Sequence, residues 1–178
     1  GRGEWVGFSF AWMAEIYAKA YNGEGAAYQL KGFFEHLCSQ NGFHLNGDFR
    51  HTGITASHYR PFTLESNMCA ADAIQEMLMQ CYDGTIRVFP AIPAAWRETG
   101  CEFEGFLSYG GIKVSSAIEN NEVRYIRLNP KKDTVCHIVN PFGCEQVQVK
   151  SGNSIKTLSG NILTLSLTAG SEYLLYSL

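Results

Sequence analysis

The chain has 178 residues, of which 46% are hydrophobic and 13% aromatic, so it can bury a core for one or two compact domains. Its formal net charge is -3 and its lysine and arginine residues are scattered, which argues against nucleic acid as a partner. It has no run of about 18 uninterrupted apolar residues, which argues against a membrane partner.

Apolar residues recur at helical spacing in three segments of the first half of the chain. We expect helices over residues 5–21, 26–38 and 66–82. Only a turn at Asn22-Gly23 separates the first two, which predicts an αα-hairpin. Ser66 or Asn67 is the expected N-cap of the third helix, since both residue types favour that position.

From Thr85 onward the sequence alternates in short segments separated by turn residues. We expect strands near residues 86–89, 113–118, 122–128, 135–139, 146–149, 162–167 and 173–176. Helices before strands predict an α+β chain, with a helical domain over residues 1–90 and an antiparallel β-sandwich over residues 91–178.

The first helix carries several bulky aromatic residues, including Trp12, with Trp5 before it and Phe8 beside it. A helix-spaced aromatic stripe is usually core, so we expect Trp12 to be buried between helices, whereas Trp5 could be core or could line a pocket. Three helices alone would leave a large apolar face exposed. We therefore expect further helices upstream of this sequence, and self-association through the exposed face is an open alternative.

The six cysteines include no Cys-x-x-Cys pair, and three of them fall inside or at the ends of apolar helical patterns. They are Cys38, Cys69, Cys81, Cys101, Cys136 and Cys144. This favours buried free thiols over disulfides, and free thiols favour a cytoplasmic protein. The first residues show no signal peptide, although one on a preceding segment is compatible with the sequence.

A long polar segment, residues 39–64, separates the second and third predicted helices. It is about 25 residues long where connections are typically about 4–6, and long ordered loops often carry function. The loop and its flanks provide carboxylates, amides and aromatic rings, the groups that bind sugar hydroxyls and pack on a pyranose ring. The candidate site residues are Trp5, His44, Asn46, Asp48, His58, Tyr59, Arg60, Glu65 and Asn67.

Each polar candidate also has a structural interpretation. Glu65 could merely complement the helix dipole, and Asn67 could merely cap the helix. Asp48 follows a glycine, as turn residues often do, and the structural interpretation leads for both Asp48 and Asn46. For Glu65 neither interpretation is preferred.

Three histidines, His44, His51 and His58, share the loop, but their spacing matches no zinc pattern. We expect them to face solvent or form hydrogen bonds, and we expect no metal site. The sequence also contains no Gly-x-Ser-x-Gly, His-Glu-x-x-His or phosphate-binding loop motif, which argues against a serine nucleophile and a nucleotide cofactor. No cofactor is therefore expected.

Three segments carry a resemblance to a known family: Pro-Phe-Thr-Leu-Glu-Ser-Asn (61–67), the helix segment 73–80, and Asp-Gly-Thr-Ile-Arg-Val-Phe-Pro with its continuation (83–96). They resemble glycoside hydrolase family 95, a family of inverting α-L-fucosidases and some related glycosidases. The likeness continues in Gly-Phe-Ser-Phe-Ala-Trp (7–12) and in residues 106–114. It covers about residues 5 to 128.

The resemblance implies an architecture with an N-terminal β-domain, an α/α-toroid and a C-terminal β-domain. This chain would supply the last helices of the toroid and the final sandwich. In the family, the aspartate of Pro-Phe-Gln-Ile-Asp-Gly-Asn is a catalytic carboxylate that works with asparagines to activate water, and Glu65 occupies the matching position. Glu65 in place of Asp and Ser66 in place of Gly are departures, and a displacement near 1 Å can cost about 10²-fold in rate.

The general acid and the water-activating asparagines of the family would lie before Gly1, so the resemblance implies that this chain is inactive alone. We expect a C-terminal fragment of a glycosidase acting on an α-L-fucoside or related glycoside with inversion, with the upstream remainder of its parent chain and the glycoside substrate as partners. The alternatives are a non-catalytic carbohydrate-binding module and a purely structural terminal domain. The sequence does not define the sugar, the linkage or the oligomeric state.

Overall fold

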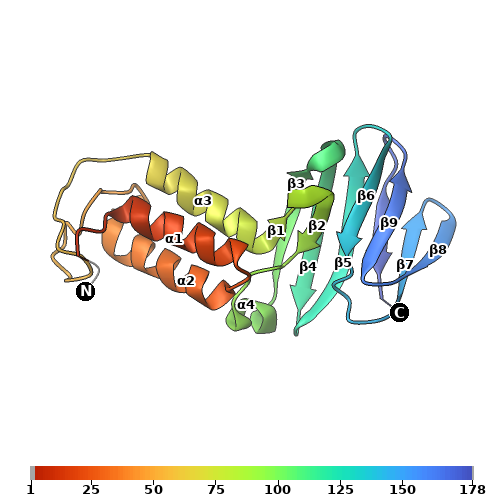
Figure 1. The fold of residues 1–178 in the computed structure, drawn as a ribbon, viewed down its shortest axis with the longest axis horizontal. Coiled ribbons are helices and arrows are strands. Elements are labelled where there is room, and N and C mark those ends of the chain that lie inside the picture. The colour runs from red at the N-terminus through yellow and green to blue at the C-terminus, as the bar shows by residue number, and fades with distance from the viewer. Residues whose placement is uncertain (1–2, 178) are drawn as a thin grey trace. The chain divides into compact units, whose positions relative to one another are not determined.

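A computed structural model describes residues 3–177 of the chain, in which helices precede strands (Figure 1). The predicted α+β order is confirmed. The chain divides into a helical unit, Gly1–Leu78 with Pro90–Pro93, and a β unit, Met79–Phe89 with Ala94–Leu178. The division differs from the expected boundary at residue 90, because Met79–Gln80 and Thr85–Val88 are strands that pair within the β unit.

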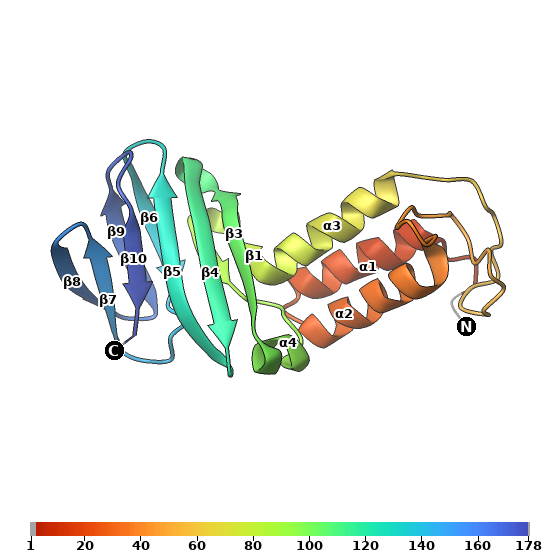
Figure 2. The same cartoon turned by 180° about the vertical axis from the view of Figure 1, so that it is seen from behind.

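Three helices form the helical unit: α1 (Gly7–Lys19), α2 (Gly23–Gly32) and α3 (Glu65–Leu78). A π-helical turn, η1 (Phe33–Leu37), extends α2. Figure 2 shows α1 between α2 and α3, and α1 packs against both. Small side chains permit this close approach, since alanines are fully or almost fully buried on all three helices. They are Ala11, Ala14, Ala18, Ala26, Ala70 and Ala73.

The helix boundaries have local causes. The Asn22 side chain accepts a hydrogen bond from the Gly25 amide (2.8 Å) and thereby caps α2, which confirms the αα-hairpin turn. The third helix ends at Leu78, four residues earlier than predicted, because Met79 pairs with Val88 in an antiparallel ladder. No helix among the described residues is both long enough and apolar enough to traverse a bilayer.

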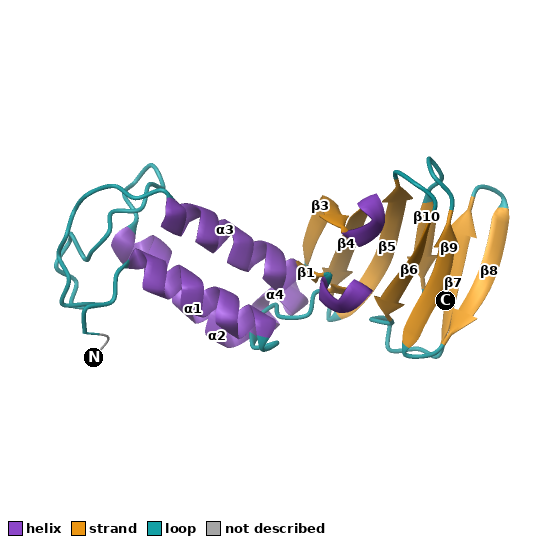
Figure 3. Cartoon of the chain, turned by 45° about the horizontal axis from the view of Figure 1, so that its top comes forward, coloured by secondary structure: helices purple, strands orange, loops and turns teal. Residues whose placement is uncertain are grey.

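Two sheets make up the β unit, whose strands are orange in Figure 3. The four-stranded sheet has the order β1 (Met79–Gln80), β2 (Thr85–Val88), β6 (Thr134–Val139), β9 (Ile162–Leu167). The six-stranded sheet has the order β3 (Cys101–Ser108), β4 (Ile112–Glu119), β5 (Glu122–Pro130), β10 (Tyr173–Tyr176), β7 (Gln146–Ser151), β8 (Ser154–Ser159). Three short helical segments connect strands: η2 (Tyr82–Gly84), α4 (Ala94–Thr99) and η3 (Tyr109–Gly111).

All strand pairs are antiparallel except β2 with β6, which is parallel. Buried and exposed residues alternate along β9, where Leu163, Leu165 and Leu167 are the buried members. The six-stranded sheet contributes Ile126 and Leu128 of β5 to the buried set. Each sheet therefore hides one apolar face, as expected for the predicted sandwich.

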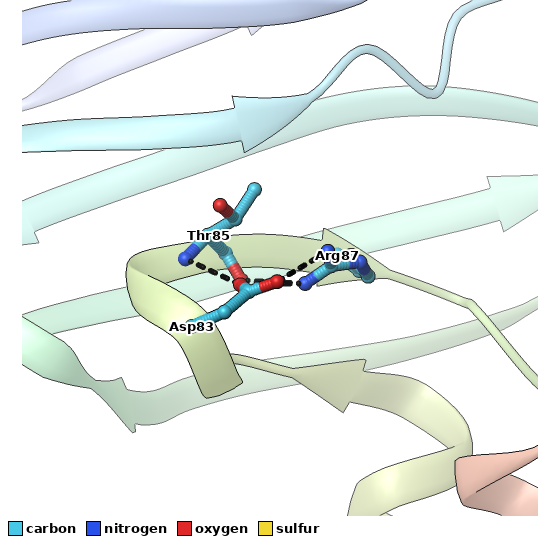
Figure 4. A network of polar contacts seen from close by, with 3 residues as sticks. All are labelled: Asp83, Thr85 and Arg87. Atoms are coloured by element: carbon cyan, nitrogen blue, oxygen red, sulfur yellow. Dashed lines mark hydrogen bonds and ion pairs between the residues drawn. The ribbon is translucent and has the colours of Figure 1, made fainter.

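The turn that leads into β2 is held by a polar network around Asp83 (Figure 4). Its carboxylate accepts hydrogen bonds from the Thr85 amide (3.2 Å) and from both terminal nitrogens of Arg87 (3.1 and 3.0 Å). Asp83 has a φ of 56°, and aspartate tolerates this left-handed conformation better than most residues. The Arg87 guanidinium also lies 4.6 Å from the centre of the Tyr82 ring.

All six cysteines are free thiols in the structure. Cys38 and Cys136 are buried, and the other four are partly exposed. Burial raises the pKa of Cys136 to about 12, and the pKa of Cys38 to about 11 against a smaller opposing effect of Arg50. These two thiols are poor nucleophiles at neutral pH.

The helices of this chain leave Trp12 exposed, as expected for three helices alone, and the burial of Trp12 between further helices stays a prediction. Its side chain is 56% exposed, and Phe8 and Ile16 beside it on α1 are exposed as well. The reason is geometric: α2 and α3 cover the alanine-rich surface of α1 and leave the bulky residues uncovered. The helical unit thus presents an apolar face made of Phe8, Trp12 and Ile16.

Candidate functional site

The candidate site is the loop that connects η1 to α3, together with the starts of α1 and α3. Figure 3 shows this loop at the end of the helical unit where both helices begin. Two isolated bridges, Cys38 with His44 and Leu45 with Phe62, fold the loop back on itself. The Asn46 amide also donates to the Pro61 carbonyl (3.1 Å). The loop therefore has an ordered backbone that can hold side chains in place.

Asp48 organises the middle of the loop. Its fully buried carboxylate accepts hydrogen bonds from the Thr52 amide (3.0 Å), the Thr52 hydroxyl (3.1 Å) and the Gly53 amide (2.8 Å). Burial alone would raise the pKa of Asp48, but these hydrogen bonds outweigh burial and hold the pKa below its ordinary value. The geometry supports the structural interpretation of Asp48, because its acceptor positions already serve the loop.

His44 is fully buried at the start of the site. Its Nδ1 lies 2.6 Å from the Thr63 hydroxyl and 3.2 Å from the Thr63 carbonyl. Its ring stacks on Phe33, with centroids 5.3 Å apart and planes 26° from parallel. Burial lowers the pKa of His44, while Thr63 and the nearby charge of Glu65 act against that shift. The ring is therefore neutral near pH 7, and the expectation of a hydrogen-bonded histidine is met.

Asn67 does not cap α3, contrary to the prediction. Its side-chain oxygen accepts from the His44 amide (3.0 Å), and its side-chain nitrogen donates to the Gly42 carbonyl (2.8 Å). The helix begins at Glu65, before either predicted cap, and Ser66 is buried with no partner for its hydroxyl among the described residues. Asn67 instead joins the loop to the helix.

Glu65 is the first residue of α3, and it is exposed. A carboxylate at a helix N-terminus is stabilised by the helix dipole. Within residues 3–177, its carboxylate forms no ion pair or hydrogen bond with another side chain. It is therefore available to accept a proton or to bind a hydroxyl group.

Three further candidates follow one another in the loop. Tyr59 is 60% exposed, and Arg60 is exposed beside it. His58 is exposed, with its Nδ1 3.0 Å from the Asp48 carbonyl and its ring 4.3 Å from that of His51.

Trp5 and Asn46 lie at the start of α1. Trp5 is partly buried and meets Phe10 edge to face, with ring centroids 5.3 Å apart. Asn46 is partly buried, and its carbonyl accepts from the Gly7 amide (3.2 Å). Both residues therefore contribute to the packing that starts α1.

The structure joins His44 to Asn67 by a hydrogen bond, with Glu65 two residues before Asn67, and brings the His58 ring against the Asp48 carbonyl. Sequence reasoning missed Thr63, Phe33 and Gly7, which hold the His44 ring. Gly7 had a signal, since it opens a motif shared with the family, whereas nothing distinguished Thr63 from other loop hydroxyls. No group of three or more histidine, cysteine or acidic residues that could bind a metal occurs in the part of the chain that the structure describes.

Comparison with known proteins places the chain in a family. Residues 80–175 match the model of the glycoside hydrolase family 95 C-terminal domain, which is more than half of the chain. The chain therefore belongs to glycoside hydrolase family 95, and the resemblance seen in its motifs is confirmed. The match covers the β unit from Gln80 onward, so Glu65 and the loop lie outside it.

One curated relative is alpha-L-fucosidase 2 of Arabidopsis thaliana, 29% identical over 123 residues. The aligned part is 68% of this chain and 14% of that protein, so the chain spans a small part of its relative. Among solved structures, Ara127N-Se, a GH127 beta-L-arabinofuranosidase from Geobacillus stearothermophilus T6, matches 95% of this chain and 30% of that chain at 13% identity and a TM-score of 0.35. At that score the likeness supports no conclusion about this chain.

Proposed function

We propose that the protein to which this chain contributes hydrolyses an α-L-fucoside or a related glycoside with inversion, and that Glu65 is a catalytic carboxylate of its site. The observation that carries the proposal is the exposed carboxylate of Glu65 at the start of α3, free of ion pairs among the described residues. Its neighbours Thr63 and Asn67 are both anchored to His44. Membership of a glycoside hydrolase family supports the reaction class.

In an inverting glycosidase, one carboxylate activates a water molecule while a carboxylic acid protonates the leaving oxygen. Glu65 is suited to the first role, because it is exposed and unpaired. The acid would lie about 6.5–9.5 Å away, which leaves room for the water, and it would come from outside this chain. The chain alone is then inactive, with the rest of the parent chain and the glycoside as its partners.

The exposed candidates of the loop are suited to a sugar. Tyr59 exposes a ring that can pack on a pyranose, and Arg60 and His58 expose donors for hydroxyl groups. Asn67 and His44 support the site through the contacts described above. Asn46, Asp48 and Trp5 act mainly by ordering the loop and the start of α1.

We further propose that the helical unit, expected over residues 1–90, is the end of an α/α-toroid, and that the sandwich, expected over residues 91–178, is the terminal domain. The apolar face of Phe8, Trp12 and Ile16 supports this proposal, because neighbouring toroid helices would cover it. Self-association through the same face is the competing outcome.

A second candidate function is non-catalytic carbohydrate binding. Phe43 and Phe62 form an aromatic pair with centroids 4.8 Å apart, and both remain about half exposed. Aromatic platforms of this kind bind sugar without an acid and a base. This alternative predicts sugar binding by a full-length parent that hydrolyses nothing.

The test is hydrolysis of a panel of aryl α- and β-glycosides, including α-L-fucoside and galactosides, by the full-length parent, its Glu65→Gln variant and this chain alone. Glu24→Gln is the matched control, since Glu24 lies in the first turn of α2 as Glu65 does in α3. We expect an active parent, an active control, loss of at least about 10²-fold in Glu65→Gln, and no activity from this chain. A Glu65→Gln variant as active as the parent would refute the assignment.

A further inference from the structure

We infer that His44 is a positioning residue for the reaction, which holds the Glu65 carboxylate in place by anchoring the residues on both sides of it. This inference rests on the proposed function of Glu65. It concerns a residue that touches no substrate and acts through its neighbours.

The anchoring begins before Glu65, at Thr63. The Nδ1 of His44 contacts the Thr63 hydroxyl at 2.6 Å, and the His44 carbonyl accepts from the Thr63 amide at 3.3 Å. Side chain and backbone of His44 therefore both bind the residue two positions before Glu65.

The anchoring continues after Glu65, at Asn67. The His44 amide donates to the Asn67 side chain at 3.0 Å. The segment 63–67 is thus attached to one buried residue on each side of Glu65. Because Glu65 is itself exposed, these attachments determine where its carboxylate can reach.

His44 is held firmly enough to serve as an anchor. Phe33 stacks on one face of its ring, and Gly7 approaches Nε2 so closely that a Cβ there would overlap it. Its Nε2 is buried and has no hydrogen-bond partner among the described residues. A buried polar atom without a partner costs about 1–3 kcal/mol, so a residue kept for packing alone would be better apolar.

An anchor of this kind matters for the reaction because the rate depends on where the Glu65 carboxylate lies. A glutamate has one more methylene than an aspartate and therefore more conformers, which disperses its carboxylate. Misplacement of a catalytic group by about 1 Å can reduce the rate about 10²-fold. Fixing the backbone on both sides of Glu65 limits that dispersion.

The experiment measures kcat, KM and the thermal midpoint in the full-length parent, with the best substrate of the glycoside panel. His44→Ala removes the ring and its contact with the Thr63 hydroxyl but keeps the backbone contacts of residue 44 with Thr63 and Asn67. His44→Asn keeps a polar atom near the Nδ1 position. Thr63→Val removes the hydroxyl contact and Thr63→Ser retains it. His137→Gln, at an exposed histidine of β6, is the control.

We expect kcat to fall about 10-fold or more in His44→Ala and Thr63→Val with little change in KM, and to recover in His44→Asn and Thr63→Ser. A merely structural role would lower the thermal midpoint and leave kcat unchanged. If His44→Ala does not fold, the Thr63 pair decides, because it alters one hydroxyl.

The Glu65→Gln variant distinguishes failure of the proposed function from failure of the inference about His44. If Glu65→Gln is inactive and the His44 and Thr63 variants keep the parent's kcat, the inference is overturned and the proposed function stands. If Glu65→Gln is as active as the parent, the proposed function fails and the inference fails with it.

Discussion

The imidazole of His44 approaches the Cα of Gly7 so closely that a Cβ at residue 7 would overlap Nε2. Gly7 begins α1, and His44 is bound to the segment before α3, so this contact joins the starts of both helices. The ring cannot retreat easily, because Phe33 stacks on one face and Thr63 holds Nδ1.

The close approach predicts that Gly7→Ala destabilises the chain by about 1–3 kcal/mol, the usual cost of overpacking a core. Urea unfolding would measure it. His44→Ala should relieve the overlap, so the double variant should be less destabilised than the sum of the two single variants. Additive effects of the two substitutions would show that the contact is not what excludes a side chain at Gly7.

Asp48 should be essential for the order of the loop. Asp48→Asn replaces an acceptor by an amide whose nitrogen would face the Gly53 or Thr52 amide, which predicts a loss of about 1–3 kcal/mol. Asp72→Asn on the exposed side of α3 is the control and should change little. Equal stability of both variants in urea would contradict the role given to Asp48.

The lowered pKa of Asp48 predicts that the stability of the folded chain depends on pH. The pKa of Asp48 is lower in the folded chain than the value of about 3.9 expected when unfolded. Its stabilising contribution is therefore complete above about pH 4 and is lost as the pH falls through the folded pKa. The difference in unfolding free energy between the unsubstituted chain and its Asp48→Asn variant should shrink as the pH falls from 6 to 2.

The cysteines should differ in the rate at which their thiols are alkylated. Burial raises the pKa of Cys136 to about 12, so at pH 8 its thiol is almost entirely protonated and reacts slowly. Labelling with iodoacetamide at pH 8, followed by mass spectrometry, should modify the partly exposed Cys144 well before Cys136. Equal labelling rates in the folded chain would contradict the burial of Cys136.

The polar network around Asp83 should contribute less to the stability of the chain than the packing of the core does. In its ion pair with Arg87 the Asp83 side chain is about half exposed, so Asp83→Asn should lower the thermal midpoint only slightly, and the effect should shrink at about 1 M salt. Ile126→Ala, in the core of the β unit, should cost about 2–5 kcal/mol. A larger effect of Asp83→Asn than of Ile126→Ala would reverse this ranking.

Periodic segments made much of the fold predictable. The three helices and the strands β2, β4, β5, β6, β7, β9 and β10 have clear apolar patterns, because each buries one face. The strand β3 was missed since Gly105 and a register shift between Phe103 and Phe106 interrupt its alternation. The strand β8 was missed because it is an edge strand with almost every residue exposed, so burial leaves no pattern in it.

The site was predictable in its residue types and not in their roles. His44 and Asn67 contact each other, which no local pattern could indicate, because contacts between residues 44 and 67 follow from tertiary folding. Their contact with sugar stays a prediction. Trp12 was expected in the core, but its exposure depends on which helices are present to cover α1. Such information is absent from local sequence patterns.

The central claim is that Glu65 supplies a catalytic carboxylate, and the most direct test is the ratio of kcat/KM for the full-length parent to that of its Glu65→Ala variant on the best glycoside substrate. We predict a ratio of at least about 10², because the water would lose its base. A ratio near one in a folded Glu65→Ala variant would contradict the account.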